Sequence, residues 1–291
     1  MSAQPAVTGL PPLHRRISLT RRSGAAANRT LAAGLVLVGA LALAAILAPV
    51  LAPHSPTAQD IAHALAAPGS SGHLLGTDHL GRDVLSRLLY GARTDLFVGV
   101  GAVIAPFILG TALGALAGYA GGWVDTLIMR LVDLVFAFPI MVLLIALVFV
   151  LQPGVVSIIV AVTVVDWVAY ARLTRAQVIG QKELDYVLAA DIGGLSGTRI
   201  LIRHILPNVI AQNVVYAMSD AVLVILAITT LGFLGLGVPP PAADWGSMIS
   251  DAQPYVDTQW WLAVFPGVAI LVTGLGLSLI GDGLAARLDR R

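Results

Sequence analysis

Long apolar stretches separated by short polar ones dominate the pattern of this sequence. A helix needs roughly 20 apolar residues to cross about 30 Å of hydrocarbon. Six stretches meet that length or come close to it: Leu31–Ala52, Leu96–Tyr119, Leu127–Leu151, Val155–Ala171, Val209–Leu236 and Trp260–Leu279. The pattern therefore predicts an all-α integral membrane protein with six transmembrane helices.

The first apolar stretch follows five arginines and runs for about 22 residues, which is long for the apolar region of a signal peptide. We interpret it as an uncleaved first transmembrane helix, preceded by a tail over residues 1–30. An extracytoplasmic loop over residues 53–95 would follow it. Residues 96–286 would then form a core with the other five transmembrane helices, and residues 287–291 a C-terminal tail.

The lysines and arginines are distributed unevenly between the two sides of this arrangement. Arg82, Arg87 and Arg93 lie between the first two spans, whereas the other fourteen of the 17 basic residues fall in the segments on the opposite side. Loops rich in lysine and arginine face the cytoplasm. We therefore expect a multi-pass protein of the cell inner (plasma) membrane with both termini in the cytoplasm.

One outer stretch, GTDHLGRDVLSRLLYGARTD at residues 76–95, holds six charged residues. On a helical wheel its apolar and polar side chains separate: Leu80, Val84, Leu85, Leu88, Leu89 and Ala92 against Arg82, Asp83, Ser86, Arg87 and Tyr90. Asp78–Arg82 and Asp83–Arg87 have the spacing of helical ion pairs, and Thr77 or Asp78 could cap the helix. The pattern predicts an amphipathic helix at the outer interface, with a solvated charged loop as the alternative.

A second polar stretch, residues 175–210, lies on the inner side. Leu184, Val187 and Leu188 form an apolar stripe on a predicted short helix, which the pair Gly193-Gly194 would end. A helix this short is not stable alone. It therefore indicates a partner surface, unless the segment is an ordinary interfacial loop.

Two aspartates fall inside predicted spans. An intramembrane carboxylate usually faces the bundle interior or an aqueous path. Asp166 lies one to two turns from Arg172 and Arg175, so we expect an ion pair there. Asp220 lies about 18 Å along the fifth helix from Asn208, near the middle of the membrane. Asp220 is a candidate for the translocation path, with a buried structural hydrogen bond as the alternative, and Asp166 is a second candidate for that path.

The start of the third span carries Arg130 and Asp133, which we expect to pair with each other. Pro139 follows later in the same span, in the run FAFP. Because proline removes one backbone hydrogen bond, it predicts a bend in this helix.

Composition and motifs exclude several functions. Only 11% of the residues are charged, which is typical of a chain built for lipid. The basic residues are distributed rather than clustered into one patch, so we expect no nucleic-acid partner. The chain has no cysteine. The spacing of His54, His63, His73 and His79 resembles no compact metal motif, so we expect ordinary solvated loop histidines and no metal.

The chain also lacks the motifs of an ATPase or a hydrolase. A phosphate-binding loop needs the pattern G-x-x-x-x-G-K-[ST], yet the single lysine, Lys182, follows a glutamine. The HExxH and GxSxG motifs are absent. We therefore expect no catalytic site and no bound cofactor, and any energy must come from other chains.

Several separated motifs resemble one family. The inner stretch is similar to the EAA loop of ABC-importer permeases at Tyr186, Val187, Ala189, Ala190, Gly194, Ser196, Arg203, His204, Leu206, Pro207 and Asn208. The stretches LGTDHLGRDVLSRLLYGAR and LGFLGLGVPPPAADWG, with FPG, GDGL and LD further on, resemble the C-type subunit of oligopeptide and dipeptide binding-protein-dependent permeases. The resemblance covers residues 31–291.

The resemblance implies the fold of type I ABC importers, with a cytoplasmic coupling helix in loop 175–207 that docks on an ATPase subunit through residues 183–198. Leu188 stands where that loop usually has glutamate, and Asp185 could compensate for it. The residues that would carry coupling are Glu183, Asp185, Tyr186, Leu188, Ala189, Ala190, Gly194 and Ser196.

The family further implies an ATP-driven importer of oligopeptides or dipeptides. Its partners would be a second homologous permease subunit, subunits that bind ATP and Mg, an extracytoplasmic substrate-binding protein, the peptide and membrane lipid. A complex of the same type importing nickel or glutathione is an alternative. An ion-coupled secondary transporter or a membrane scaffold would be a protein of a different class.

Overall fold

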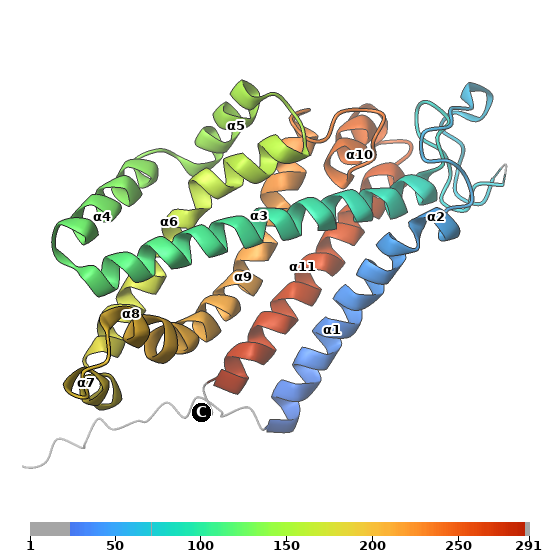
Figure 1. Cartoon of the computed structure of the whole chain (residues 1–291). Coiled ribbons are helices and arrows are strands. Elements are labelled where there is room, and N and C mark those ends of the chain that lie inside the picture. Colours follow the sequence, from blue (N-terminus) through green and yellow to red (C-terminus); the bar gives the residue numbers. More distant parts are fainter. Residues whose placement is uncertain (1–23, 71, 289–291) are drawn as a thin grey trace, which may run out of the picture.

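The computed structural model describes residues 24–70 and 72–288 of the 291-residue chain. In this part every regular element is a helix (Figure 1), which confirms the predicted all-α class. The helices are α1 (Gly24–Ile46), α2 (Ala48–Leu51), α3 (Val84–Ala120), α4 (Gly122–Phe136), α5 (Ile140–Leu151), α6 (Val155–Lys182), α7 (Asp185–Ile192), α8 (Gly197–Ile200), α9 (Leu206–Phe233), α10 (Trp245–Ala252) and α11 (Trp261–Leu288), with short turns at Ile61–His63, Leu201–Ile205 and Gln253–Tyr255.

Five described helices are long and apolar enough to cross a membrane: α1, α3, α6, α9 with the turns before it, and α11. The pair α4 and α5 makes a sixth if the two count as one broken span. These helices meet at an angle of 89° across residues 137–139. The bend predicted at Pro139 is therefore confirmed, and the number of spans is five or six.

The first, fourth and sixth spans begin or end elsewhere than the hydropathy pattern predicted. The sixth, α11, continues past Leu279 to Leu288, so residues 287 and 288 are helical rather than part of a tail. Helix α1 starts at Gly24, so residues 24–30 are helical rather than part of a tail, and residues 1–23 lie outside the described part. Helix α6 continues past Ala171 to Lys182. It can do so because its arginines are paired: Arg175 donates to Asp125 of α4 and Arg172 to Asp133.

The second span differs more. Helix α3 is one continuous helix of 37 residues, about 55 Å long at 1.5 Å per residue. The predicted amphipathic helix from Leu80 along the outer interface is therefore wrong (Figure 1). Residues from Val84 onward form the first turns of the spanning helix itself, and Leu80 lies in the preceding loop.

Small residues bring α3 and α6 close together. Gly110, Gly114 and Gly118 recur every four residues along α3. A Cβ atom added at these glycines would lie 2.2, 2.4 and 2.8 Å from the backbone carbonyl oxygens of Trp167, Ala171 and Arg175. Such stripes let helix backbones touch within membranes, where association depends on close packing. The long α3–α6 contact forms the centre of the fold.

The helices α1 and α11 pack antiparallel, which brings the two described ends of the chain together. Arg287 near the end of α11 donates to Asn28 at the start of α1 (3.1 Å), and Gly283 packs against Leu31. In Figure 1 these ends and α7 lie toward the lower edge, whereas α10 and the loop between α2 and α3 lie at the upper edge and upper right. The apolar spanning helices thus separate the end of the molecule that holds α7 from the end that holds α10 and the loop between α2 and α3.

Candidate functional site

Helix α7 projects from the lower end of the helix bundle (Figure 1). It is anchored by Val187, which is only 4% exposed and packs in a cluster with Val178 of α6 and Ile200 of α8. The predicted short helix is therefore present. A helix of eight residues is not stable alone, and the packing of Val187 against the rest of the chain stabilises it.

The other face of α7 is apolar and exposed. Leu184, Leu188 and Ile192 lie four residues apart, and their side chains are 43%, 47% and 87% exposed. Residues spaced by four share one face of a helix. The stripe predicted from Leu184, Val187 and Leu188 thus divides: Val187 points into the protein, and the two leucines lie on the exposed face.

The end of α7 is a tight glycine turn. Gly194 has φ +77°, and the next amide, that of Leu195, donates to the carbonyl oxygen of Ala190 (3.2 Å). Glycine adopts this left-handed conformation without steric cost. The predicted end of the helix at Gly193-Gly194 is confirmed.

Polar contacts hold α7 itself and the end of α6 just before it. Asn208 at the start of α9 donates to the hydroxyl oxygen of Tyr186 (3.1 Å), which itself donates to Gln181. Lys182 donates to the carbonyl oxygen of Tyr119 at the end of α3 (2.9 Å). The remaining predicted coupling residues are exposed or, for Ala190, half-buried: Glu183, Asp185, Ala189, Ala190 and Ser196. All eight predicted coupling residues therefore lie on one projecting segment.

The two intramembrane aspartates lie together. Asp220 is 4% exposed and accepts a hydrogen bond from Tyr170 (2.7 Å), and Asp166 interacts directly with the carboxyl group of Asp220. The predicted pairing of Asp166 with Arg172 and Arg175 is wrong, because both arginines pair with α4 instead. Sequence distance along α6 could not reveal that α9 brings a second acid.

The predicted local pair at the start of the third span is also wrong. Asp133 of α4 accepts from Arg172 of α6 at 2.8 Å, and the Arg172 guanidinium lies 4.3 Å from the ring centroid of Phe136. Arg130, three residues before Asp133, is exposed. Asp133, which we predicted to pair with Arg130, therefore joins α4 to α6 through Arg172.

Asp78, Arg82 and Arg87 of the charged stretch 76–95 are buried rather than spread over a helix surface. Asp78 accepts from Arg82 at 2.6 Å and lies 3.4 Å from Arg87, and both arginines also lie near Asp251 of α10. The predicted Asp78–Arg82 pair is confirmed as a contact, although it lies outside a helix. Arg87, however, faces Asp78 and Asp251 and not Asp83. Buried charges need such partners, because an unpaired charge in an apolar site is costly.

Asp83, rather than Thr77 or Asp78, caps the helix. Its Oδ2 accepts from the backbone amide and the hydroxyl of Ser86, both at 2.7 Å. Its Oδ1 accepts from Nδ1 of His73 (2.8 Å), whose side chain is buried. The expectation of solvated histidines is therefore wrong for His73. The folded loop places this residue beside Asp83 at the start of α3.

One buried polar group was missed by sequence reasoning. Asn213 of α9 is fully buried and donates to the hydroxyls of Thr111 on α3 (3.0 Å) and Thr174 on α6 (2.7 Å). A lone asparagine in an apolar span was the available signal, since such a side chain must find partners within the bundle.

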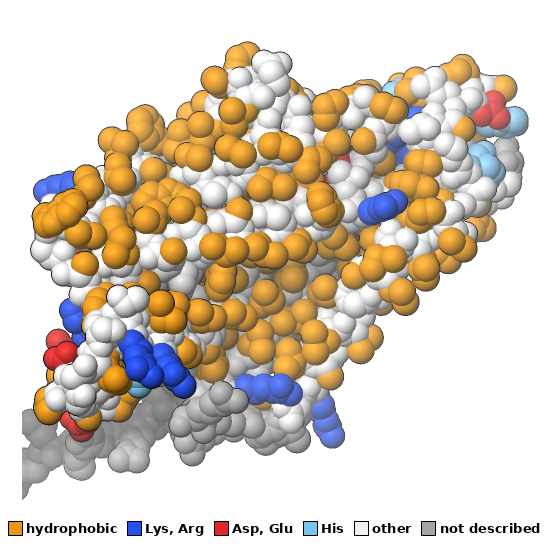
Figure 2. All heavy atoms as spheres, in the orientation of Figure 1, with side chains coloured by type: hydrophobic (Ala, Val, Ile, Leu, Met, Phe, Trp, Pro, Cys, Tyr) orange, Lys and Arg blue, Asp and Glu red, His pale blue; other side chains and the backbone are white. Residues whose placement is uncertain are grey.

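Apolar side chains cover the flanks of the helices, and basic side chains gather at the lower end around α7 (Figure 2). These features define a multi-pass membrane protein with a projecting segment at its basic end. The chain belongs to the family described as "Binding-protein-dependent transport system inner membrane component", whose model matches residues 110–291. A second model, "N-terminal TM domain of oligopeptide transport permease C", matches residues 26–68.

Similar proteins cover nearly the whole chain. It is 40% identical to the di/tripeptide transport system permease protein DppC of Pseudomonas aeruginosa, over 90% of this chain and 88% of that protein. It is also 40% identical to the dipeptide transport system permease protein DppC of Haemophilus influenzae, over 90% of each chain. The probable D,D-dipeptide transport system permease protein DdpC of Escherichia coli is 39% identical over 87% of this chain and 85% of that protein.

Proposed function

We propose that this chain is a permease subunit of an ATP-driven importer that carries dipeptides or oligopeptides into the cell. The observation that carries the proposal is the exposed apolar face of α7, formed by Leu184, Leu188 and Ile192. An apolar face on a fixed, projecting helix suits a groove in a partner. The partner is the ATPase subunit, which moves the membrane helices by pushing on this segment.

The peptide substrate is inferred from the similar proteins, whose names specify dipeptides and tripeptides. In this proposal ATP and Mg bind to separate subunits. The single lysine of the chain, Lys182, lies in no phosphate-binding motif and donates a hydrogen bond to Tyr119 at the end of α3. A second permease subunit and an external substrate-binding protein complete the complex.

The orientation follows from the basic residues. The α7 end carries Arg172, Arg175, Lys182, Arg199 and Arg203, and Arg287 lies at the same end near the start of α1. By the positive-inside rule this end faces the cytoplasm. Helix α7 is then on the side where ATP is available, and α10 with the loop of residues 53–83 faces outward.

The aspartates of α6 and α9 are proposed to border the translocation path. Asp166 is partly exposed and contacts the more deeply buried Asp220, so the acid pair reaches the surface of this subunit. Intramembrane carboxylates of this kind usually face an aqueous path or a bundle interior. A second permease subunit packed against this face would enclose the pair.

Co-purification tests the α7 contact. The permease is expressed with its ATPase subunits and captured by a tag on its N-terminus. The wild type is expected to retain the ATPase, and the variant Leu188→Asp/Ile192→Asp to lose it. Leu74→Asp alters an equally exposed leucine (66%) in the outer loop and should retain it. Full retention in the α7 variant would refute the contact.

A further inference from the structure

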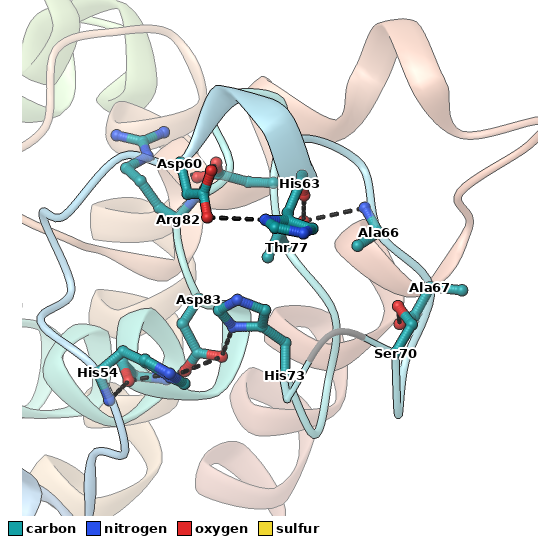
Figure 3. A network of polar contacts seen from close by, with 12 residues as sticks. His54, Asp60, His63, Ala66, Ala67, Ser70, His73, Thr77, Arg82 and Asp83 are labelled. Atoms are coloured by element: carbon teal, nitrogen blue, oxygen red, sulfur yellow. Dashed lines mark hydrogen bonds and ion pairs between the residues drawn. The ribbon is translucent and has the colours of Figure 1, made fainter.

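The loop between α2 and α3 forms a pocket of about 260 Å³ that is open to the surface. Three histidines and two aspartates border it: His54, His63, His73, Asp60 and Asp83 (Figure 3). His63 donates to Asp60 at 2.8 Å, and this hydrogen bond lowers the pKa of the Asp60 carboxyl, which is therefore charged at neutral pH. The pocket thus combines imidazole nitrogens with negative charge.

Three of these side chains converge on one point. Nδ1 of His73 lies 2.8 Å from Asp83 Oδ1, and Nδ1 of His54 lies 3.7 Å from the same oxygen. One ligand atom from each of the three residues falls within 4.8 Å of the others. Ligands about 2.1 Å from one zinc ion at tetrahedral angles are about 3.4 Å apart. The spacing of the three atoms therefore matches a shared ion after small side-chain shifts.

The surroundings hold this group in place. The second oxygen of Asp83 is fixed by the amide and hydroxyl of Ser86, and the backbone amide of His54 donates to the same hydroxyl (3.2 Å). Ligating carboxylates in metal sites are usually oriented by such outer hydrogen bonds. Gly81 lets the chain close around the pocket: it has φ +72°, and an added Cβ would lie 1.8 Å from the carbonyl oxygen of Asp60.

We propose that His54, His73 and Asp83 bind a divalent transition-metal ion, with Zn²⁺ as the best fit, through both Nδ1 atoms and Oδ1. A water from the pocket completes four ligands. The His73 imidazole stays neutral: its Nδ1 gives up the proton that it shares with Asp83, Nε2 takes one from solvent, and the freed lone pair of Nδ1 binds the ion. Two imidazoles and one carboxylate favour zinc-like ions over Mg²⁺ and Ca²⁺, which take oxygen ligands.

The bound ion joins three separate segments: the chain after α2 at His54, the chain at His73, and Asp83, the residue that caps α3. It therefore acts as a structural clamp on the outer loop. The proposal is independent of peptide import and of α7, which lies at the other end of the molecule (Figure 1).

The test uses the full chain in detergent, purified through a tag without histidine and stripped with a chelator. Zn²⁺ is titrated by calorimetry, and Co²⁺ binding is followed by its visible absorption, which no cysteine contributes to here. His54→Gln is the main variant, because its half-exposed side chain (43%) can change without unfolding the loop. His73→Gln is the second, and His79→Ala the control: it removes a loop histidine that stacks on Tyr255 instead.

The wild type and His79→Ala are expected to bind one Zn²⁺ per chain and to unfold at a higher temperature with it. Both glutamine variants should bind at least tenfold more weakly, and the tetrahedral Co²⁺ spectrum should disappear. No binding by the wild type, or equal binding by the wild type and His54→Gln, would show that the cluster is only a hydrogen-bonded helix cap.

Discussion

Lys182 at the end of α6 donates a hydrogen bond to the carbonyl oxygen of Tyr119 at the end of α3 (2.9 Å), and its ammonium group lies 5.2 Å from the centroid of the Tyr119 ring. A cation at a helix C-terminus satisfies an otherwise unpaired carbonyl and the negative end of the helix dipole. Because α7 begins three residues later, this contact fixes the point from which α7 projects.

Lys182→Met keeps the length of the side chain but removes the charge and the donor. We expect the assembled complex to persist, with the ATP hydrolysis that loaded binding protein stimulates reduced a few-fold, because α7 is less firmly held. Lys182→Arg should restore most of the stimulation. Wild-type stimulation in the methionine variant would show that this contact does not position α7.

The glycine stripe of α3 gives a prediction about stability. In Gly114→Ala the new Cβ would lie 2.4 Å from the carbonyl oxygen of Ala171, so α3 and α6 must separate. Overpacking of this kind costs about 1–3 kcal/mol. The midpoint of thermal aggregation in detergent, read by size-exclusion chromatography, should fall.

Gly39→Ala is the matched control, because a Cβ at this helical glycine of α1 has no neighbour within 4 Å. Its midpoint should equal that of the wild type. Equal midpoints for both variants would contradict the close α3–α6 contact.

The acid pair gives a prediction about transport. Asp220→Asn keeps an oxygen that can accept from Tyr170, so the assembled complex should remain intact while the rate of peptide uptake or the preference among peptides changes. Tyr170→Phe removes only the donor; it should cost about 1 kcal/mol of stability and leave uptake per complex unchanged. Uptake in proteoliposomes and gel filtration give the two readings. Loss of assembly in Asp220→Asn would instead assign the acid a structural role.

The orientation can be tested by cysteine labelling, since the chain has no cysteine of its own. Leu74→Cys in the exposed outer loop should react with an impermeant thiol reagent in intact cells. Ser196→Cys after α7 should react only after the membrane is permeabilised. The reverse pattern would place α7 outside the cell and overturn the proposed contact with an ATPase.

Features that depend on neighbouring residues could be predicted from the sequence. The bend at Pro139 and the turn at Gly194 follow from the backbone properties of single residues. The short helix before Gly193 follows from its apolar stripe. Span lengths were less accurate, because partners on another helix, such as Asp125 for Arg175, let α6 continue beyond its apolar part.

Features that depend on distant residues could not be predicted. A helical wheel separates Arg82 and Arg87 from the apolar side, yet Asp251 of α10, far along the chain, buries both arginines. His73 and Asp83 are ten residues apart, and only the folded loop brings them within 2.8 Å. The contact of Asp166 with Asp220 could not be predicted for the same reason, because the two residues lie on different helices.

The central claim is that α7 transmits the ATPase cycle to the membrane helices, and Gly194→Val tests it most directly. At φ +77° a β-branched residue is strained, while nothing lies within 4 Å of the added Cβ, so only the turn after α7 should change. Gly180→Val is the control, because it adds the same side chain in the ordinary helical backbone of α6 with open space around it.

The measurement is ATP hydrolysis by the reconstituted complex, with and without dipeptide-loaded binding protein. We predict that Gly194→Val assembles and retains basal hydrolysis but loses the stimulation and dipeptide uptake, whereas Gly180→Val keeps both. Stimulated hydrolysis and uptake at wild-type levels in Gly194→Val would contradict a coupling role for α7.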